Sequence, residues 1–522
     1  MVASAVGLAV RFVRLPYSIA LVIVGLFIGA CHLLPPVTMT PELILLVCLP
    51  ALLFEASWNL NLKELARNWR PIILLAVPGV LVSMAVAGFV LHTLGHLAWP
   101  LALLFGAITA ATDPISVLAL FRKMGIDKRL SLILEAESLF NDGTAVVLFK
   151  LILGIALSYV ASTQAGSVAA PFVVSPGALA GSFVISVCGG ALVGLFVGYC
   201  LSYVTKFFDD HLLEITLTAI CAYGSYLLAE QLHVSPVIAV LIAGIVVGNF
   251  GSRVYMGPAT RLAVDSFWEY AAFIVNSIVF LLIGLQIDFP LLVKYGSLIG
   301  CGILSILAAR LVLVYLFGPL LSTKELPISL SWRHMLFWGA IRGSLSMALA
   351  LSLPYSFAPR EEMIVLTFGV TLFTLLVPGL TIEPLAKILK LAQNARINFQ
   401  YERLKGKLFA EKQALNTLDL MVDEGMIGAV LYEEMAEELR LNIEKFVRDI
   451  EDLKIGDDLL AGTARSNTER QLLEVRKDAL TKLLREHGAE RSVVEELVLE
   501  IDKKMENLKT DQQILEADND GK

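Results

Sequence analysis

The chain has few charged residues. Asp, Glu, Lys and Arg make up 17% of its 522 residues, compared with about 25% in a typical soluble protein. Hydrophobic residues make up 57%. This composition excludes an ordinary water-soluble protein, and it predicts a chain that lies in a lipid bilayer.

Motifs of several chemical classes are missing from the sequence. It has no glycine-rich phosphate loop, no group of Cys and His at metal-ligand spacing, and no nucleophile triad. The six cysteines lie in or beside apolar segments and form no CxxC pair, so we interpret them as small buried hydrophobic residues. We therefore expect no enzyme, no hydrolysis as an energy source, no cofactor and no nucleic-acid partner.

The charges that are present divide the chain into two parts. Residues 391–522 contain 20 basic and 29 acidic residues, a net charge of −9, whereas residues 1–390 contain 21 basic and 19 acidic residues, a net charge of +2. We expect a membrane domain over 1–390 and a helical region in water over 391–522. The second region has apolar residues at helical intervals. This pattern agrees with a regulatory region that binds itself, the membrane domain or a regulator, and equally with a simple solvated extension.

The first part contains twelve apolar windows long enough to cross a membrane, which takes about 20 residues. Residues 1–10 resemble the last turns of a further helix, so the expected fold is an all-α polytopic membrane protein with 12 or 13 transmembrane helices. The windows are 15–34, 41–58, 71–94, 99–120, 131–158, 176–205, 213–230, 235–250, 268–287, 293–321, 331–354 and 362–390.

Lys and Arg are absent from every second connection in the first half of this domain. Residues 31–39, 92–98, 162–174 and 231–234 contain neither, whereas the connections between them are basic. Basic loops stay on the cytoplasmic side of a membrane. We therefore expect a multi-pass protein of the cell membrane with its C-terminal region in the cytoplasm.

The fourth window contains an acid followed by proline, Asp113–Pro114, near its middle. Proline removes a backbone donor and disfavours helix at the preceding residue, so we expect the backbone to open around Thr112 and Asp113. Free carbonyls in such broken helices can coordinate a cation. A simple proline kink, with Asp113 bonded to the backbone, is the alternative.

The fifth window contains EAESLFNDG, in which polar residues pair at a spacing of four. Glu137 shares a helix face with Asn141, and Ser138 shares one with Asp142. Asp142 and the Ser138 hydroxyl offer hard oxygen atoms to a small cation. Glu137 would be a costly second charge, and Arg310 is the candidate to neutralise it.

The eleventh window contains Arg342, the only other base in the middle of a window, which could serve one of the remaining acids. Gly339 and Gly343 lie on either side of it, and we expect a second helix interruption there; close helix packing is the other reason for such glycines. The two broken windows lie seven apart. This predicts two inverted repeats around an ion site at mid-membrane, an arrangement of alternating-access transporters.

Glu55 lies near the cytoplasmic end of the second window. It would either guide cations toward the site or only face water, and the sequence does not decide between these roles.

Six segments together resemble the prokaryotic NhaP-type Na+/H+ antiporters of the first cation/proton antiporter family, which are related to animal sodium/proton exchangers. The resemblance covers about residues 10–390 and is specific in order and spacing. The segments are LFEASWNL, ATDPISVLAL, EAESLFNDGTAVVLF, VIAVLIAGIVVGN, FLLIGLQI and GAIRGSLSMALAL.

The resemblance implies a homodimer in which a core domain moves against a dimerisation domain, with the ion held where two broken helices cross. It implies that Asp113 and Asp142 are central to transport and that Na+ is held by Asp142, Ser138 and the Thr112 backbone, with Glu55 as a further candidate. It also implies a structural pair of Glu137 with Arg310, while Asn141 marks a branch that is generally electroneutral.

The predicted function is exchange of Na+, with Li+ or K+ as other candidate cations, for H+ in competition at Asp142 and Asp113. A cation channel would need rings of charge, for which there is no sign. A membrane scaffold or sensor, in which the C-terminal region carries the function, would tolerate Asp142→Asn.

Overall fold

The computed structural model describes residues 6, 17–31, 42–164, 176–207, 210–252, 255–285, 289–322, 328–389, 391–423 and 426–455, and also residues 472, 473, 477, 497, 501 and 504. Over these residues the chain is helical and contains no strand. It divides into two compact units, Met1–Leu389 and Lys390–Lys522. The boundary lies where the composition changes from apolar to charged.

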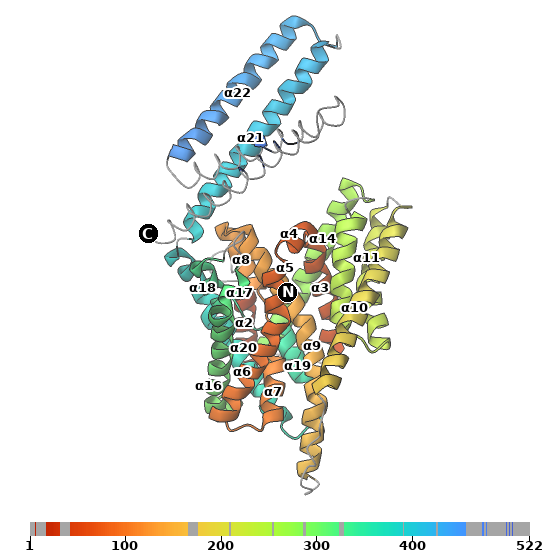
Figure 1. Cartoon of the computed structure of the whole chain (residues 1–522), viewed down its shortest axis with the longest axis vertical. Helices are drawn as coiled ribbons and strands as arrows, with labels where there is room; N and C mark the ends of the chain where they lie inside the picture. Colours follow the sequence, from red (N-terminus) through yellow and green to blue (C-terminus); the bar gives the residue numbers. More distant parts are fainter. Residues whose placement is uncertain are drawn as a thin grey trace. The chain divides into compact units, whose positions relative to one another are not determined.

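The described residues of the first unit are mostly helical (Figure 1). Three of the helices, labelled η, are π-helical. The helices are α2 (Tyr17–Ala30), η1 (Leu43–Cys48), α3 (Leu49–Asn59), α4 (Leu62–Arg67), α5 (Trp69–Ala76), α6 (Pro78–Leu94), α7 (Trp99–Ile108), α8 (Ile115–Met124), α9 (Lys128–Gln164), α10 (Pro176–Thr205), α11 (His211–Gln231), α12 (Pro236–Val246), η2 (Val247–Gly251), α14 (Pro258–Leu285), α15 (Phe289–Lys294), α16 (Gly296–Leu311), η3 (Val312–Leu316), α17 (Gly318–Leu321), α18 (Leu330–Trp338), α19 (Ser344–Leu351) and α20 (Arg360–Ile388).

Among the described residues, seven helices are long and apolar enough to cross a membrane, and four shorter helices are also apolar. The prediction of an all-α multi-pass membrane protein is confirmed. The fourth and eleventh windows are not single helices, because each consists of two short helices separated by an irregular segment. The further helix expected over residues 1–10 lies outside the described residues, apart from Val6.

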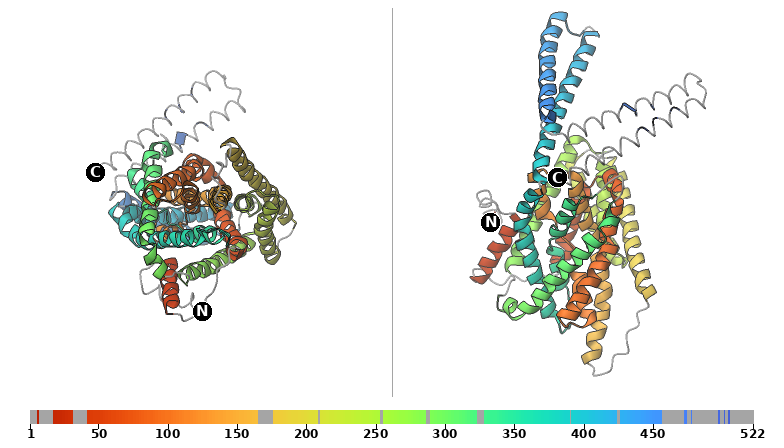
Figure 2. Two further views of the ribbon diagram at one scale, coloured as in Figure 1. Left: turned by 90° about the horizontal axis from the view of Figure 1, so that it is seen from below. Right: turned by 60° about the vertical axis from the view of Figure 1, so that its left-hand side comes forward.

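The helices of the first unit pack in two groups. One group contains α2, α3, α10, α11, α12 and α14, and the other contains α5, α6, α7, α16, α18, α19 and α20. Helix α9 packs against α5, α7 and α19 of the second group and also against α3, α10 and α12 of the first. Figures 1 and 2 show α10, α11 and α14 together along one side. Helix α9 therefore lies at the boundary between the groups.

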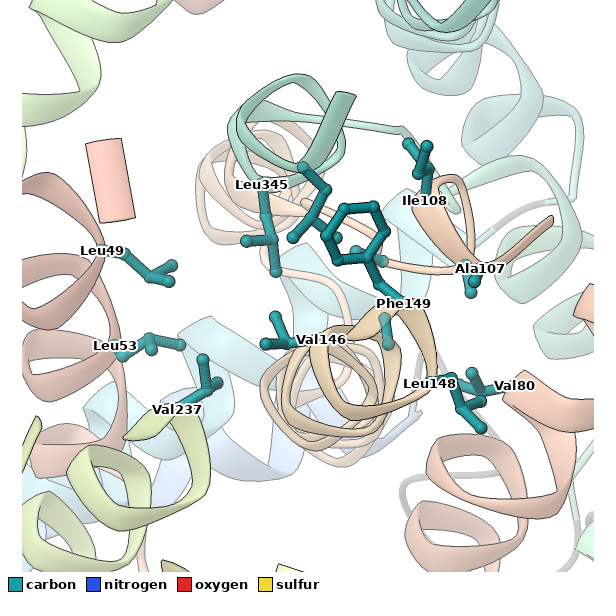
Figure 3. Packing of buried hydrophobic residues seen from close by; sticks show 14 of the residues in the cluster. Leu49, Leu53, Val80, Ala107, Ile108, Val146, Leu148, Phe149, Val237 and Leu345 are labelled. Carbon is teal, nitrogen blue, oxygen red and sulfur yellow. The ribbon is translucent and has the colours of Figure 1, made fainter. Parts of the chain in front are cut away.

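Buried apolar side chains fill the boundary between the groups. Leu49 and Leu53 of α3 and Val237 of α12 lie opposite Val146 of α9 and Leu345 of α19 (Figure 3). All five are buried. The contact between the groups is therefore dry and apolar at this level of the unit.

The second unit contains two long helices, α21 (Leu391–Asp423) and α22 (Ala429–Ile455), which pack against each other. Leu418 and Ala436 are buried there. Tyr432 donates a hydrogen bond from its hydroxyl to Asp419 Oδ1 at 2.7 Å, and this bond raises the pKa of Tyr432. These two helices lie in the part of the chain where the sequence has apolar residues at helical intervals.

Candidate ion-binding site

The first break lies between α7 and α8, where residues 109–114 leave the helix. Pro114 caps α8, and its missing N–H and the clash that it makes with a preceding turn stop α7 from continuing. The expected opening around Thr112 and Asp113 is confirmed. It exposes backbone groups that a continuous helix would use internally.

The second break lies between α18 and α19, at residues 339–343. The two breaks meet, because Asp113 N donates to Ile341 O at 2.7 Å. A Cβ atom on Gly343 would overlap the side chain of Asp113. Glycine at 343 therefore permits the close approach of the two irregular segments, and the expected interruption bracketed by Gly339 and Gly343 is confirmed.

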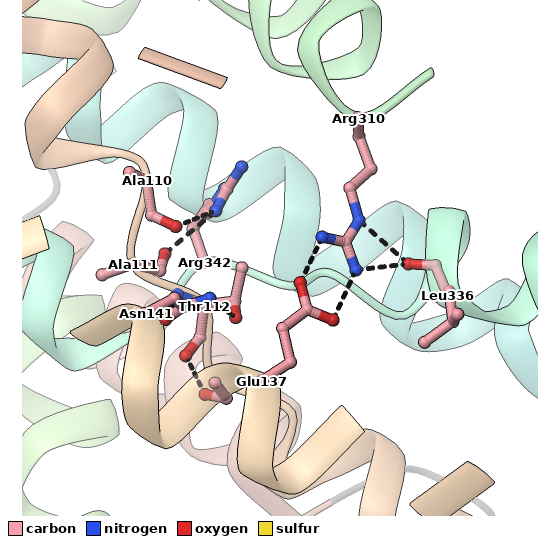
Figure 4. Close-up of polar contacts among 9 residues, drawn as sticks. Ala110, Ala111, Thr112, Glu137, Asn141, Arg310, Leu336 and Arg342 are labelled. Atoms are coloured by element: carbon pink, nitrogen blue, oxygen red, sulfur yellow. Dashed lines mark hydrogen bonds and ion pairs between the residues drawn. The ribbon is translucent and has the colours of Figure 1, made fainter. Parts of the chain in front are cut away.

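Thr112 is bound from α9 by two side chains. Ser138 donates its hydroxyl hydrogen to the Thr112 carbonyl oxygen. Asn141 Nδ2 donates to Thr112 Oγ1 at 2.7 Å, and Thr112 N donates to Asn141 Oδ1 at 3.4 Å (Figure 4). All three residues are buried. One turn of α9 thus fixes the open backbone of the first break.

Asp142 follows Asn141 on the same turn of α9. Its Oδ1 atom is shielded from solvent and has no hydrogen-bond partner among the described residues. The charges that act on it are those of Asp113 and Arg342. A buried carboxylate oxygen normally has a partner, so this atom is available for a cation or a proton.

Glu137 and Arg310 form an ion pair, with Arg310 Nη2 at 3.0 Å from Glu137 Oε2 and Nη1 against Oε1. Arg310 Nε and Nη2 also donate to Leu336 O at 3.0 and 2.8 Å (Figure 4). Both charged residues are at most 4% exposed. The structure therefore brings together the two residues that the sequence suggested as a pair, and it adds the end of α18 to them.

The sequence offered Arg342 as an ion-pair partner for one of the remaining acids, but its side chain donates hydrogen bonds to backbone carbonyl oxygens. Its Nη1 donates to Ala110 O at 2.9 Å and Ala111 O at 3.1 Å, beside the C-terminal end of α7. In turn, Asp113 accepts hydrogen bonds from the backbone N–H groups of Ile115 and Ser344, at the start of α8 and α19. Each charge faces the helix end of opposite partial charge.

The contacts of Glu55 are with residues outside this cluster. It is partly exposed, and its Oε1 accepts a hydrogen bond from Asn59 at 3.0 Å. The charges that act on it belong to Glu135, Arg122 and Glu269. No hydrogen bond joins it to Thr112, Ser138 or Asn141 among the bonds of the described residues.

The profile of the family described as "Sodium/hydrogen exchanger, transmembrane" matches residues 1–388. The chain belongs to this family. The exchanger is 44% identical to the Na(+)/H(+) antiporter ApNhaP of Aphanothece halophytica over 415 residues, which are 78% of this chain and 76% of that one. It is 37% identical to the low-affinity Na(+)/H(+) antiporter NhaS1 of Synechocystis sp. over 492 residues, 93% of this chain and 90% of that one.

The exchanger also resembles a solved structure in fold. The sodium proton antiporter MjNhaP1 from Methanocaldococcus jannaschii matches with a TM-score of 0.60 at 21% identity, over 75% of this chain and 96% of that chain. The resemblance to the antiporter family that the sequence motifs indicated is confirmed.

Two polar residues of the exchanger's candidate site were not predicted from the sequence. Thr374 of α20 accepts a hydrogen bond from Arg342 N at 3.1 Å, and Ser346 of α19 donates to Ala111 O at 3.4 Å. Thr371 and Thr374 lie three residues apart in an apolar run. This spacing is the sequence signal that could have indicated a polar face of α20 toward Arg342.

Proposed function

We propose that the exchanger is a secondary active transporter that moves Na+ in one direction and H+ in the other across the membrane by alternating access. The observation that carries this proposal is the unpartnered, buried Oδ1 of Asp142 next to two touching helix breaks. The names of the relatives agree with this activity.

In this proposal the cation binds among hard oxygen atoms. Asp142, the Ser138 hydroxyl and the Thr112 carbonyl oxygen would supply ligands, with Asp113 as a second carboxylate. Ser138 Oγ and Thr112 O already lie against each other, so a cation between them would replace one hydrogen bond with two coordination contacts. A proton on Asp142 would remove the charge that attracts the cation, and the two ions would compete.

The charges of the site favour a one-for-one exchange without net charge movement. Glu137 and Arg310 cancel as an ion pair. Asp113 and Asp142 together with Arg342 leave one negative charge, which one monovalent cation or one proton neutralises. The loaded site can then cross the low-dielectric interior, whereas the empty site would carry an unpaired charge at high cost.

The proposal extends to the assembly and to the second unit. The group of α2, α3, α10, α11, α12 and α14 would form the dimerisation domain of a homodimer, and the other group with α9 would move as the core. The second unit would lie in the cytoplasm and regulate transport by binding the membrane unit or a regulator. No cofactor enters this scheme, because transported Na+ and H+ are the only ions that it needs.

Proton movement in proteoliposomes on adding Na+, Li+ or K+ tests the function. We expect a cation-dependent pH change that disappears in Asp142→Asn and persists in Glu361→Gln, which removes an exposed acid at the start of α20. Abolishing the membrane potential should leave the rate unchanged. An unaltered response in Asp142→Asn would refute the proposed site.

A further inference from the structure

Helix α9, which in the proposed function moves with the second group, touches the first group one residue away from Asp142. Gly143 of α9 packs against Ile238 of α12, and a Cβ atom placed on Gly143 would overlap Ile238 Cδ1. The same Cβ position lies 2.8 Å from Ile238 Cγ1 and 3.7 Å from Val237 Cγ1. The Ile238 side chain therefore fills the space that any larger residue at 143 would occupy.

The contact continues as a purely apolar layer on one side of Asp142. Val146 lies one turn beyond Asp142 in the direction away from Lys128, and it faces Leu53 and Val237 (Figure 3). These three side chains are at most 5% exposed. A layer without polar atoms excludes hydrated ions, so this side of the site is closed.

The opposite side of Asp142 is charged. Glu135 lies two turns before Asp142 on α9, and its charge interacts with that of Arg122. Glu55 on α3 interacts with both of them and is partly exposed. The side of Asp142 toward Lys128 therefore has carboxylates, whereas the described side chains on the other side, Val146, Leu53 and Val237, are apolar.

We propose that Ile238 is a gate residue, whose side chain against Gly143 closes the ion site on the face of the membrane where α12 begins. This inference rests on the proposed exchange function. In each transport cycle the α9 group would move against α12, and Ile238 would leave the surface of Gly143 when that face opens. Ile238 touches no ion and acts by excluding water and ions from the path.

A leak measurement tests the gate. Proteoliposomes with a pH gradient and choline as the only external cation hold that gradient if the protein is closed on one side at all times. We expect the gradient to decay several times faster with Ile238→Ala than with the wild type. The matched control is Ile242→Ala, which shortens a residue one turn along α12 that packs near Gly194 of α10.

A gradient retained by Ile238→Ala as well as by the wild type would overturn the gate, as would an equal leak in Ile242→Ala, which would mean a general loss of packing. The same vesicles also report exchange on adding Na+. If the wild type exchanges Na+ and the Ile238→Ala vesicles keep their pH gradient, only the gate is refuted. If the wild type shows no exchange, the proposed function and the gate are both refuted.

A rescue experiment supplies a second test. Gly143→Ala adds the methyl group that overlaps Ile238 Cδ1, so we expect exchange to slow because the gate cannot close. Ile238→Val lacks the Cδ1 atom and keeps Cγ1, 2.8 Å from the added methyl group, so Gly143→Ala/Ile238→Val should recover part of the lost exchange. A double variant that is slower than Gly143→Ala would contradict a gate at this contact, because it would show two independent packing defects.

Discussion

Thr112 uses its carbonyl, its amide and its hydroxyl to hold the first break to α9. Replacing its hydroxyl with a methyl group in Thr112→Val would leave the buried Asn141 Nδ2 without an acceptor, a loss worth about 1–3 kcal/mol. We expect Na+-dependent proton movement to fall about tenfold or more, because the same turn positions Asp142. Thr112→Ser keeps the oxygen atom and should retain most of the rate. Equal rates in the two variants would refute the role of this bond.

We expect the buried Glu137–Arg310 pair to affect stability more directly than transport. Glu137→Gln leaves Arg310 charged and buried without its partner, which typically costs about 3–5 kcal/mol. We expect a lower melting temperature in detergent and a lower yield of monodisperse protein. Glu137→Gln/Arg310→Gln removes both charges and should recover part of the loss, although Leu336 O loses its donors. A single variant that melts with the wild type would contradict the pair's importance.

The site residues differ in how far the sequence could predict them. Ser138, Asn141 and Asp142 follow from helical spacing, and Thr112 follows from the proline two residues later. The contacts of Arg342 could not be predicted, because its partners are the carbonyl oxygens of Ala110 and Ala111. A backbone group has no residue-type signature, so only the folded chain shows which carbonyls are free.

At the scale of elements, α10 and α12 approach each other closely because α10 has glycine at every fourth position of their contact. A Cβ atom on Gly194 would overlap Ala239 O. We expect Gly194→Val to force the helices apart and to lower stability by about 1–3 kcal/mol, measured as the melting temperature. Gly181→Val is the control on the same helix, because nothing lies within 4 Å of a Cβ there. Equal melting of the two variants would show that the close approach is not required.

The sequence predicted the breaks in the fourth and eleventh windows, because proline and paired glycines act locally on the backbone. The sequence did not predict how the helices pack into two groups. A span in lipid is apolar on all sides, so its sequence does not tell which face meets another helix and which meets lipid. Helix α9 illustrates this, since Val146 and Leu148 are equally apolar and buried, and Val146 alone of the two faces α3 and α12 in Figure 3. The inverted repeats and the homodimer stay predictions.

At the scale of the whole molecule, the two units differ in the solvent that they suit. The first buries its site among its own helices, and α21 and α22 of the second pack on each other. We therefore expect a chain that ends at Leu389 to insert and to exchange Na+ for H+ at saturating Na+ at a rate similar to that of the full chain. If the second unit is regulatory, the pH profile of exchange should differ between the chain that ends at Leu389 and the full chain.

Three chains in matched proteoliposomes distinguish the roles of the second unit. The full chain, a chain ending at Ile455 that keeps α21 and α22, and a chain ending at Leu389 are compared across pH at fixed Na+. Identical profiles would make the second unit a solvated extension, whereas a shift confined to the shortest chain would assign regulation to α21 and α22. Insertion without any exchange in the shortest chain would contradict the independence of the membrane unit, because the ion site would then need the second unit to work.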